Sequence, residues 1–240
     1  MEPSSHAPRA PHLIADAATL AAYVKDVAAG GHSWQAPNGQ VTLEGWLALG
    51  DDCTEGAYTL ATRLGLPLVR LQELPPSAEA TALLRPEVVR RLRAVPLRLY
   101  EGVVTIAMED PGSPDSLATL DFLCRQRVLP LVATAREVRE GIAEHYDKVE
   151  DRDVAHQLGL DPGAAGHETS IQEAERLSRE KPVVRIVQGL IGEAVMRRAS
   201  DIHLRPGEHG TEVLYRIDDE MVPVRRLLRS LHPAVTSRVK

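Results

Sequence analysis

Asp201 and His203 are the residues of this chain whose types and spacing most plainly suit chemistry. They lie two positions apart in a run that alternates apolar and polar residues, and positions i and i+2 of a β-strand face the same side. A carboxylate beside an imidazole could act as a general base or supply two ligands to a metal ion. No third ligand in a pattern such as HExxH accompanies them. We therefore interpret them as a hydrogen-bonded structural pair, and we predict neither a catalytic residue nor a metal site.

Cys53 and Cys124 are the only cysteines, and no CxxC arrangement contains them. Neither a disulfide framework nor a structural zinc site is indicated by two isolated cysteines. We expect both to be small buried hydrophobic residues in a reducing cytoplasm.

The composition limits the classes of partner. A chain of 240 residues with 43% hydrophobic content can build one large or two small domains. Its net charge of −6 argues against nucleic acid as a partner, because that role needs a clustered basic face. No window approaches 18 uninterrupted apolar residues, so we expect no direct insertion into a membrane. The Pro- and Ser-rich start, residues 1–12, is expected to be disordered.

Periodicity and turn signals predict a first α/β domain over residues 13–147. Thr54 is expected to cap one helix, and Thr134–Glu137 is a capping-box pattern that opens the last one. The expected helices are 13–29, 43–49, 55–63, 116–125 and 134–146, and the expected strands are 66–71, 95–100, 103–108 and 128–133, the middle two forming a hairpin.

Residues 148–181 are charged and contain the run DPGAAGHETS, which indicates a linker with a short helix near 170–180. A second domain, residues 182–240, is expected to begin with a long amphipathic helix behind Pro182 and to continue into a β-hairpin. The predicted fold class is α/β (α+β), with two small domains joined by a charged linker.

Residues 181–221, KPVVRIVQGLIGEAVMRRASDIHLRPGEHGTEVLYRIDDEM, resemble the start of the second amino-terminal domain, a PAS-like N2 domain, of the type II secretion and type IV pilus assembly ATPases, the GspE/PilB family. Upstream, RLGLPLVRL at 63–71 and the segment 83–111 resemble that family's first domain, called MshEN or N1. The two resemblances occur in the family's order.

This resemblance implies a hexameric motor in which a carboxy-terminal RecA-like domain uses ATP and Mg to drive pilus or pseudopilus assembly. The 240 residues contain no G-x-x-x-x-G-K-[ST], the loop that holds the nucleotide phosphates. We therefore expect a non-catalytic chain without a cofactor of its own. The first domain is expected to dock to the cytoplasmic domain of an inner-membrane platform protein, which would place the chain in the cytoplasm, peripheral to that membrane.

Arginines of the family's second domain contact the nucleotide. Alignment places Arg229 at one such position and Leu214 at the other, and Arg216 on the same strand could substitute for Leu214. The favoured alternative is that Arg216 pairs with Asp218 or another surface carboxylate. Asp219 stands where the family has a glycine, at a turn that favours positive φ.

Some MshEN domains bind cyclic di-GMP through two tandem motifs that begin with RLG. Here only Arg63-Leu-Gly is present, which makes Arg63 the candidate contact, although Gly65 could simply turn a helix into a strand. The alternative function is therefore a stand-alone regulatory module that binds cyclic di-GMP or a motor subunit. The arginine-rich segment 85–98 could meet an acidic partner or form a solvated helix face.

Overall fold

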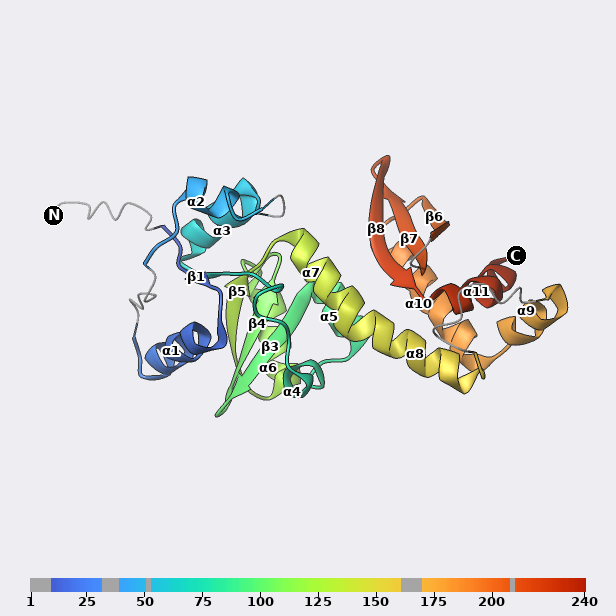
Figure 1. Cartoon of the computed structure of the whole chain (residues 1–240), viewed down its shortest axis with the longest axis horizontal. Helices are drawn as coiled ribbons and strands as arrows, with labels where there is room; N and C mark the ends of the chain where they lie inside the picture. The colour runs from blue at the N-terminus through green and yellow to red at the C-terminus, as the bar shows by residue number, and fades with distance from the viewer. Residues whose placement is uncertain (1–9, 32–38, 51–52, 161–169, 208–209) are drawn as a thin grey trace. The chain divides into compact units, whose positions relative to one another are not determined.

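The computed structural model describes residues 10–31, 39–50, 53–160, 170–207 and 210–240. The chain forms two compact units, Met1–Ile142 and Ala143–Lys240, and each is described by itself (Figure 1). Both combine helices with a β-sheet, which confirms the predicted α/β class. The expected disordered start lies almost wholly outside the described residues, as does the run at the centre of the expected linker.

A five-stranded sheet forms the centre of the first unit, in the order β1-β2-β5-β4-β3. β1, β2, β5 and β4 run parallel, whereas β3 is an antiparallel edge strand. β4 is buried along its whole length, as expected of an interior strand covered on both faces. The strands are β1 (Leu13–Ile14), β2 (Leu68–Val69), β3 (Ala94–Tyr100), β4 (Val103–Met108) and β5 (Arg127–Val132). The hairpin predicted at β3 and β4 is present.

Six helices lie in the described part of the first unit before residue 134, and five begin at a side chain that caps them. The capping oxygen accepts a hydrogen bond from the third backbone N–H of the helix, a group that has no partner inside the helix. The caps are Asp16, Thr42, Thr54, Ser77 and Ser113. The helices are α1 (Ala17–Ala28), α2 (Leu43–Leu47), α3 (Glu55–Leu64), α4 (Ala78–Thr81), α5 (Pro86–Leu92) and α6 (Pro114–Cys124).

The start of the first helix differs from the prediction. The sequence predicts a helix over 13–29, but Leu13 and Ile14 form β1 and pair with Leu68 and Val69 of β2. The helix begins only after the Asp16 cap. Pairing with a strand that is distant in the sequence determines the structure of these residues. The local spacing of apolar residues does not reveal that partner.

Trp46 is the largest side chain in a core cluster beside β2 and is fully buried. Its indole Nε1–H donates a hydrogen bond of 3.0 Å to the backbone oxygen of Thr54, at the start of α3. The other buried members of the cluster are Cys53, Ala57, Ala61, Leu68 and Val132.

One continuous helical run crosses the division between the units. It consists of α7 (Ala135–Ile142), a π-helical turn (Ala143–Asp147) and α8 (Lys148–Gln157). The predicted capping box opens it: Glu137 N–H donates to Thr134 Oγ1 at 3.2 Å, and Thr134 N–H donates to Glu137 Oε2 at 3.4 Å. α8 occupies the first part of the segment predicted as a linker.

The second unit places helices on a three-stranded antiparallel sheet, in the order β6-β7-β8. The predicted short helix and long helix are both present, as α9 and α10. The sequence predicted only a hairpin, whereas a third strand, β8, and a further helix, α11, follow it. The elements are α9 (Ile171–Ser178), α10 (Lys181–Met196), β6 (Asp201–Gly207), β7 (Gly210–Ile217), β8 (Glu220–Leu227), a 3-10 turn (Arg229–Leu231) and α11 (His232–Val239).

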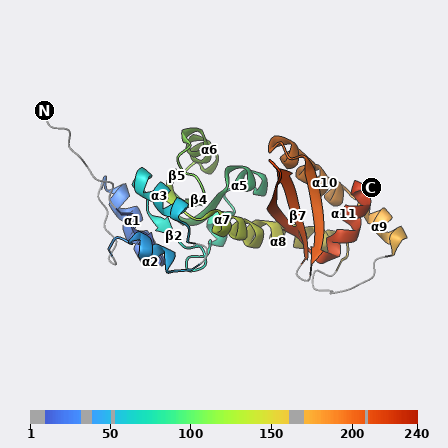
Figure 2. The same cartoon turned by 90° about the horizontal axis from the view of Figure 1, so that it is seen from above.

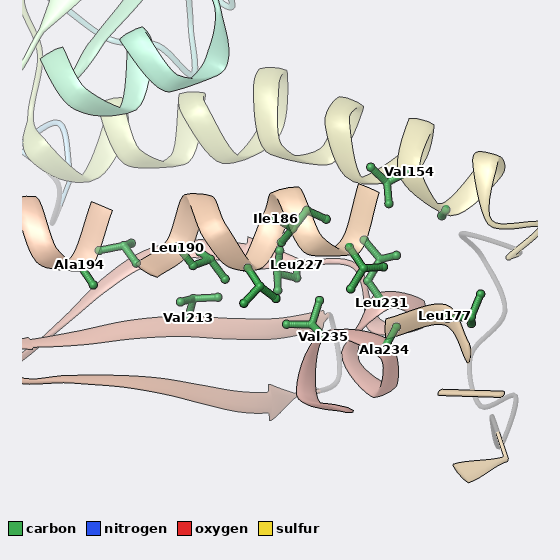
Figure 3. Close-up of a cluster of buried hydrophobic side chains, with 14 of the residues drawn as sticks. Val154, Leu177, Ile186, Leu190, Ala194, Val213, Leu227, Leu231, Ala234 and Val235 are labelled. Atoms are coloured by element: carbon green, nitrogen blue, oxygen red, sulfur yellow. The ribbon is translucent and has the colours of Figure 1, made fainter. Parts of the chain in front are cut away.

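The core of this unit lies between α10 and one face of the sheet, and α8, α9 and α11 contribute to it (Figures 2 and 3). The Tyr215 hydroxyl of β7 donates a hydrogen bond of 2.7 Å to the backbone oxygen of Leu190 in α10. The members labelled in Figure 3 are Val154, Leu177, Ile186, Leu190, Ala194, Val213, Leu227, Leu231, Ala234 and Val235. In the part of the chain that the structure describes, every helix falls short of what crossing a bilayer requires in length and apolar content.

The turn between β7 and β8 has left-handed backbone at two aspartates. Asp218 has φ 48° and Asp219 has φ 66°, as a type I′ turn requires. We expect Asp219→Gly to raise the free energy of unfolding of the second unit by about 0.5–1 kcal/mol, because glycine adopts this conformation without steric cost. Denaturant unfolding measures the change. Glu220→Gly, in the adjoining strand, is the control and should destabilise; a loss of stability in Asp219→Gly would contradict the prediction.

Candidate functional site

Arg216, the first of the two arginine candidates, lies near the end of β7 opposite Asp201 of β6. Its Nε atom is 3.3 Å from Asp201 Oδ2, and both side chains are exposed enough to meet solvent. Asp201 also accepts a hydrogen bond of 2.8 Å from the Ser200 hydroxyl. A surface carboxylate of its own unit therefore holds Arg216, and that carboxylate is Asp201 rather than Asp218.

Asp201 and His203 face the same side of the sheet, as the strand spacing predicted, opposite Arg216 and Leu214. The hydrogen bond expected between the two is not formed, because Asp201 turns to Arg216 and Ser200 instead. Among the described residues no three His, Cys, Asp or Glu side chains gather as metal ligands would.

Arg229, the second candidate, lies in the 3-10 turn that follows β8, and its side chain is exposed. Within the described ranges no carboxylate pairs with its guanidinium, in contrast to Arg216. An exposed guanidinium without a carboxylate partner among the described residues can engage an anionic ligand without first breaking an ion pair.

The two arginines lie at opposite ends of the second sheet. Arg216 stands beside Met221 at the start of β8, whereas Arg229 follows Leu227 at its end. A strand rises about 3.3 Å per residue, so the six steps from Met221 to Leu227 separate the two by roughly 20 Å. The structure therefore does not bring them together at one phosphate group.

Arg225 of β8 forms a buried ion cluster that the sequence reasoning missed. Its terminal nitrogen lies 2.5 Å from Asp151 Oδ1 and 3.2 Å from Glu150 Oε2, and its Nε lies 3.9 Å from Asp147 Oδ1. Asp151 also accepts a hydrogen bond of 3.0 Å from the Leu228 backbone N–H. The cluster fixes the π-helical turn and α8 to the last strand. Asp147 and Asp151 lie four residues apart, which is about one helical turn. That spacing places both carboxylates on one helix face and was the only sign of the cluster in the sequence.

Burial raises the pKa of Asp151 to about 6 from its ordinary 3.8; nearby Asp147 adds to the rise, while Arg225 and the Leu228 N–H oppose it. Because the folded-state pKa exceeds the unfolded value, this group stabilises the fold fully below pH 4, and the contribution disappears as the pH rises through 6. We expect the free energy of unfolding of the second unit to fall by about 1–3 kcal/mol over that range.

Denaturant unfolding from pH 4.5 to 7.5, followed by hydrogen exchange in β7, tests this effect against Asp151→Asn. The asparagine variant removes the titrating group, so its stability should lose this part of the pH dependence. Equal pH dependence in both proteins would contradict the assignment to Asp151.

A second buried ion pair, Arg70 with Glu137, lies in the first unit. Arg70 Nε is 3.3 Å from Glu137 Oε1, and the Arg70 terminal nitrogen donates to the backbone oxygen of Leu49 at 2.9 Å. Glu137 also accepts from the Leu71 N–H at 3.3 Å and from the Thr134 hydroxyl at 3.0 Å. Burial raises the pKa of Glu137, and the Thr134 and Arg70 contacts oppose that rise. The pair joins the chain after α2 to β2 and α7.

Arg63 lies in the last turn of α3 with its side chain exposed. Gly65 ends that helix at φ 65°, a left-handed position that glycine adopts freely. In the arginine-rich segment, Arg93 pairs with Glu109 at 2.7 Å and Arg98 donates to the Pro75 backbone oxygen at 2.5 Å. Part of that segment is thus occupied within the unit.

Both cysteines are buried and unbonded to each other, as expected. Burial raises the pKa of the Cys124 thiol to about 11, with the Asp121 carboxylate adding to the rise. A thiol held protonated at neutral pH is a poor nucleophile and a poor metal ligand.

Two family models match the chain, in successive regions. Residues 64–152 match the MshEN domain, and residues 176–240 match the Type II/IV secretion system protein family. The order of the matches is that of the sequence resemblance.

Curated relatives cover both regions together. The chain is 30% identical over 184 residues to the type IV pilus assembly ATPase PilB of Myxococcus xanthus, which covers 75% of this chain and 32% of that protein. It is 30% identical over 189 residues to PilB of Thermus thermophilus; the matched region covers 77% of this chain and 21% of that protein. It is 28% identical over 212 residues to type II secretion system protein E of Xanthomonas campestris pv. campestris; the matched region covers 84% of this chain and 36% of that protein. The chain thus spans about a third or less of the length of these relatives.

Two solved structures are similar at low level. MshE with cdg aligns at a TM-score of 0.36 with 21% identity, over 55% of this chain and 89% of that one. The N-terminal domain of XpsE aligns at a TM-score of 0.35 with 21% identity, over 55% of this chain and 86% of that one.

Proposed function

Because the chain is an N-terminal region of the GspE/PilB-like family of type II secretion and type IV pilus assembly ATPases, we propose that it couples the motor to its membrane platform and to its nucleotide. The first unit would dock to the cytoplasmic domain of an inner-membrane platform protein. The second unit would supply an arginine to the ATP site of a hexameric assembly. The chain would work in the cytoplasm, peripheral to the inner membrane. The observation that carries the proposal is the succession of the MshEN and secretion-family matches along one chain.

An exposed apolar surface on α6 supports docking by the first unit. Phe122, the only phenylalanine of the chain, is 80% exposed, and Leu123 beside it is 39% exposed. Aromatic side chains that are exposed in the free protein are frequent anchors of protein interfaces. Part of the arginine-rich segment is occupied within the unit, which makes α6 the better candidate surface.

Calorimetric titration of the chain with the soluble cytoplasmic domain of its cognate platform protein tests the docking role. We expect binding, and we expect Phe122→Ser to weaken it by about tenfold or more. Val149→Ser removes an exposed apolar side chain from α8 of the second unit and should leave affinity unchanged. No heat of binding, or equal loss in both variants, would count against docking through α6.

Arg229 is the better candidate for nucleotide contact, because it has no carboxylate partner among the described residues, whereas Arg216 is paired with Asp201. In the assembled ATPase, Arg229→Ala should lower kcat by about a hundredfold or more, as loss of an arginine that neutralises phosphate charge does. Arg226→Ala, on the last strand, is the matched control and should leave kcat near wild type. An unchanged kcat in Arg229→Ala would remove Arg229 from the nucleotide site.

ATP hydrolysis itself would belong to a domain outside these residues. The 240 residues contain no phosphate-binding G-x-x-x-x-G-K-[ST] loop, so we propose that the chain does not turn over ATP by itself. ATP and Mg would be held by the RecA-like part of the assembly.

Binding of cyclic di-GMP by the first unit is the second candidate function. The MshEN match begins directly after Arg63, and the Arg63 guanidinium has no ion-pair partner among the described residues. A titration with cyclic di-GMP should show binding that Arg63→Ala abolishes. The absence of heat at high dinucleotide concentration would remove this candidate and leave docking unaffected.

A further inference from the structure

Arg229, the candidate for nucleotide contact, is carried by a short turn that is fixed on both sides. Leu227, the last residue of β8, is 1% exposed, and Leu231, the last residue of the 3-10 turn, is fully buried. Both belong to the core of the second unit (Figure 3). The Leu231 N–H also donates a hydrogen bond of 3.0 Å to the Leu228 backbone oxygen. The backbone of Arg229 is therefore held between two buried side chains, while Arg229 itself is exposed.

A carboxylate of α8 anchors the start of this turn. The turn begins at Leu228, whose apolar side chain cannot cap it. Asp151 Oδ2 accepts a hydrogen bond of 3.0 Å from the Leu228 N–H, directly before Arg229. The other oxygen, Asp151 Oδ1, accepts from the Arg225 terminal nitrogen at 2.5 Å. The two oxygens of one buried carboxylate thus hold the end of β8 at two points, and hydrogen bonds to an ionised group are stronger than neutral ones.

α8 is itself part of the core, so the anchor is rigid. Asp151 is fully buried, and Ala155, four positions later on the same helix face, is fully buried as well. Val154 and Ala155 belong to the core cluster of the unit. α8 also contacts both β8 and the 3-10 turn. A side chain that is locked by packing and hydrogen bonds can hold a functional group in one geometry. The position of α8 therefore sets the position of the backbone that carries Arg229.

The contact between Asp151 and Leu228 also joins the two family matches. Asp151 lies in the region that matches the MshEN domain, residues 64–152. Leu228 and Arg229 lie in the region that matches the Type II/IV secretion system protein family, residues 176–240. The hydrogen bond spans 77 positions of the sequence. A residue of the first region is thus bonded to the backbone beside the candidate arginine of the second.

We propose that Asp151 is a positioning residue for Arg229, which holds the turn so that the guanidinium reaches the ATP site of the assembled motor. This role rests on the proposed function, because it takes Arg229 as the arginine that contacts the nucleotide. Asp151 touches no nucleotide and acts through the Leu228 backbone. A displacement of about 1 Å at a reacting centre can cost about a hundredfold in rate, so a distant buried carboxylate can control it. Movement of α8 then alters ATP hydrolysis through Arg229, and the MshEN-matching region gains a route to the nucleotide.

Hydrogen exchange of the chain by itself tests the anchoring step. In Asp151→Ala the Leu228 amide should exchange about tenfold faster or more, relative to the amides of β7, because it loses a charged acceptor. Asp151→Asn keeps an oxygen that can accept the same N–H, so its effect should be smaller. Glu150→Gln is the matched control: Glu150 lies 3.2 Å from the same Arg225 nitrogen, but the Leu228 N–H is donated to Asp151. Exchange at Leu228 should therefore match wild type in Glu150→Gln, and equal exchange in Asp151→Ala and wild type would overturn the proposal.

A double-mutant cycle in the assembled ATPase tests the positioning step. Arg229→Ala should lower kcat by about a hundredfold or more, as stated above. Asp151→Ala should lower kcat by about tenfold, and Asp151→Asn should recover most of that loss. Because Asp151 acts through Arg229, adding Asp151→Ala to Arg229→Ala should lower kcat no further. A carboxylate that only stabilised the fold would lower kcat by the same factor in both backgrounds.

The outcomes separate this role of Asp151 from the proposed function. A loss of kcat in Arg229→Ala with unchanged kcat in Asp151→Ala would overturn the positioning role and leave Arg229 at the nucleotide. Equal factors in both backgrounds would overturn it too, whereas an unchanged kcat in Arg229→Ala would overturn both. Arg225 keeps Asp147 and Glu150 beside it in Asp151→Ala, so that variant should fold, and circular dichroism checks this.

Discussion

Replacing Arg225 by methionine will lower the free energy of unfolding of the second unit by about 3–5 kcal/mol. Arg225 is the cation that Asp147, Glu150 and Asp151 share, and its side chain is 5% exposed. Methionine fills a similar volume but removes the cation that lies beside two fully buried carboxylates, Asp147 and Asp151. The loss arises more from removing the cation shared by these buried carboxylates than from the individual contacts.

Hydrogen exchange in β7 and β8 as a function of denaturant measures this loss in the intact chain. Arg226→Met is the matched control: it is the next residue, its side chain is 54% exposed, and it lies 3.9 Å from Glu212. Exposed pairs contribute about 0–1 kcal/mol, so this variant should stay close to wild type. Adding Asp147→Asn and Asp151→Asn to Arg225→Met should restore part of the stability. Equal effects of the two methionine variants would mean that the cluster does not hold the unit together.

Glu137→Ala is expected to destabilise the first unit by a similar amount, about 3–5 kcal/mol. It removes the carboxylate that pairs with buried Arg70, and it removes the acceptor of the Leu71 N–H and of the Thr134 hydroxyl. The capping box of α7 is lost with it, which alone costs about 1 kcal/mol. Two segments of the unit, Arg70-Leu71 and Thr134 before α7, therefore lose a common partner in one substitution.

Glu140→Ala on the same helix is the control for this prediction. Glu140 pairs with Arg136 at 2.9 Å, and both side chains are about half exposed. Such an i,i+4 pair contributes about 0.3–0.5 kcal/mol. Thermal unfolding with hydrogen exchange in β2 and β5 should separate the two variants widely. A Glu137→Ala protein as stable as Glu140→Ala would show that Arg70 finds another partner at little cost.

Short-range signals accounted for most of the elements that the sequence predicted correctly. The Thr134–Glu137 capping box, the Thr54 cap and the hairpin of β3 and β4 all depend on residues within a few positions of one another. Side-chain periodicity likewise found α10 and its apolar face. Where the physical cause of a structure is local, the local sequence records it.

The missed features depend on distant partners. β1 exists because Leu13 pairs with Leu68, and the charged stretch after residue 147 is a helix whose acids face Arg225, more than 70 positions away. Read by themselves, those acids indicated a solvated linker, since charge is normally exposed. The spacing of Asp147 and Asp151 showed a helix face, but nothing nearby identified the cation that would bury them. The positions of Arg216 and Arg229 at opposite ends of the sheet could not be predicted either, because the sequence did not predict the third strand, β8, that separates them.

The burial of Trp46 has a spectroscopic consequence. The chain has two tryptophans, at positions 34 and 46, and none after residue 142; of the two, only Trp46 lies among the described residues. The indole of Trp46 is shielded from water and hydrogen-bonded to a backbone carbonyl, so its emission should shift to longer wavelength when that unit opens. The second unit contributes no indole signal, and only tyrosines such as Tyr215 absorb there. Excitation at the red edge of the absorption band, which selects tryptophan, therefore reports on unfolding of the first unit and not on unfolding of the second.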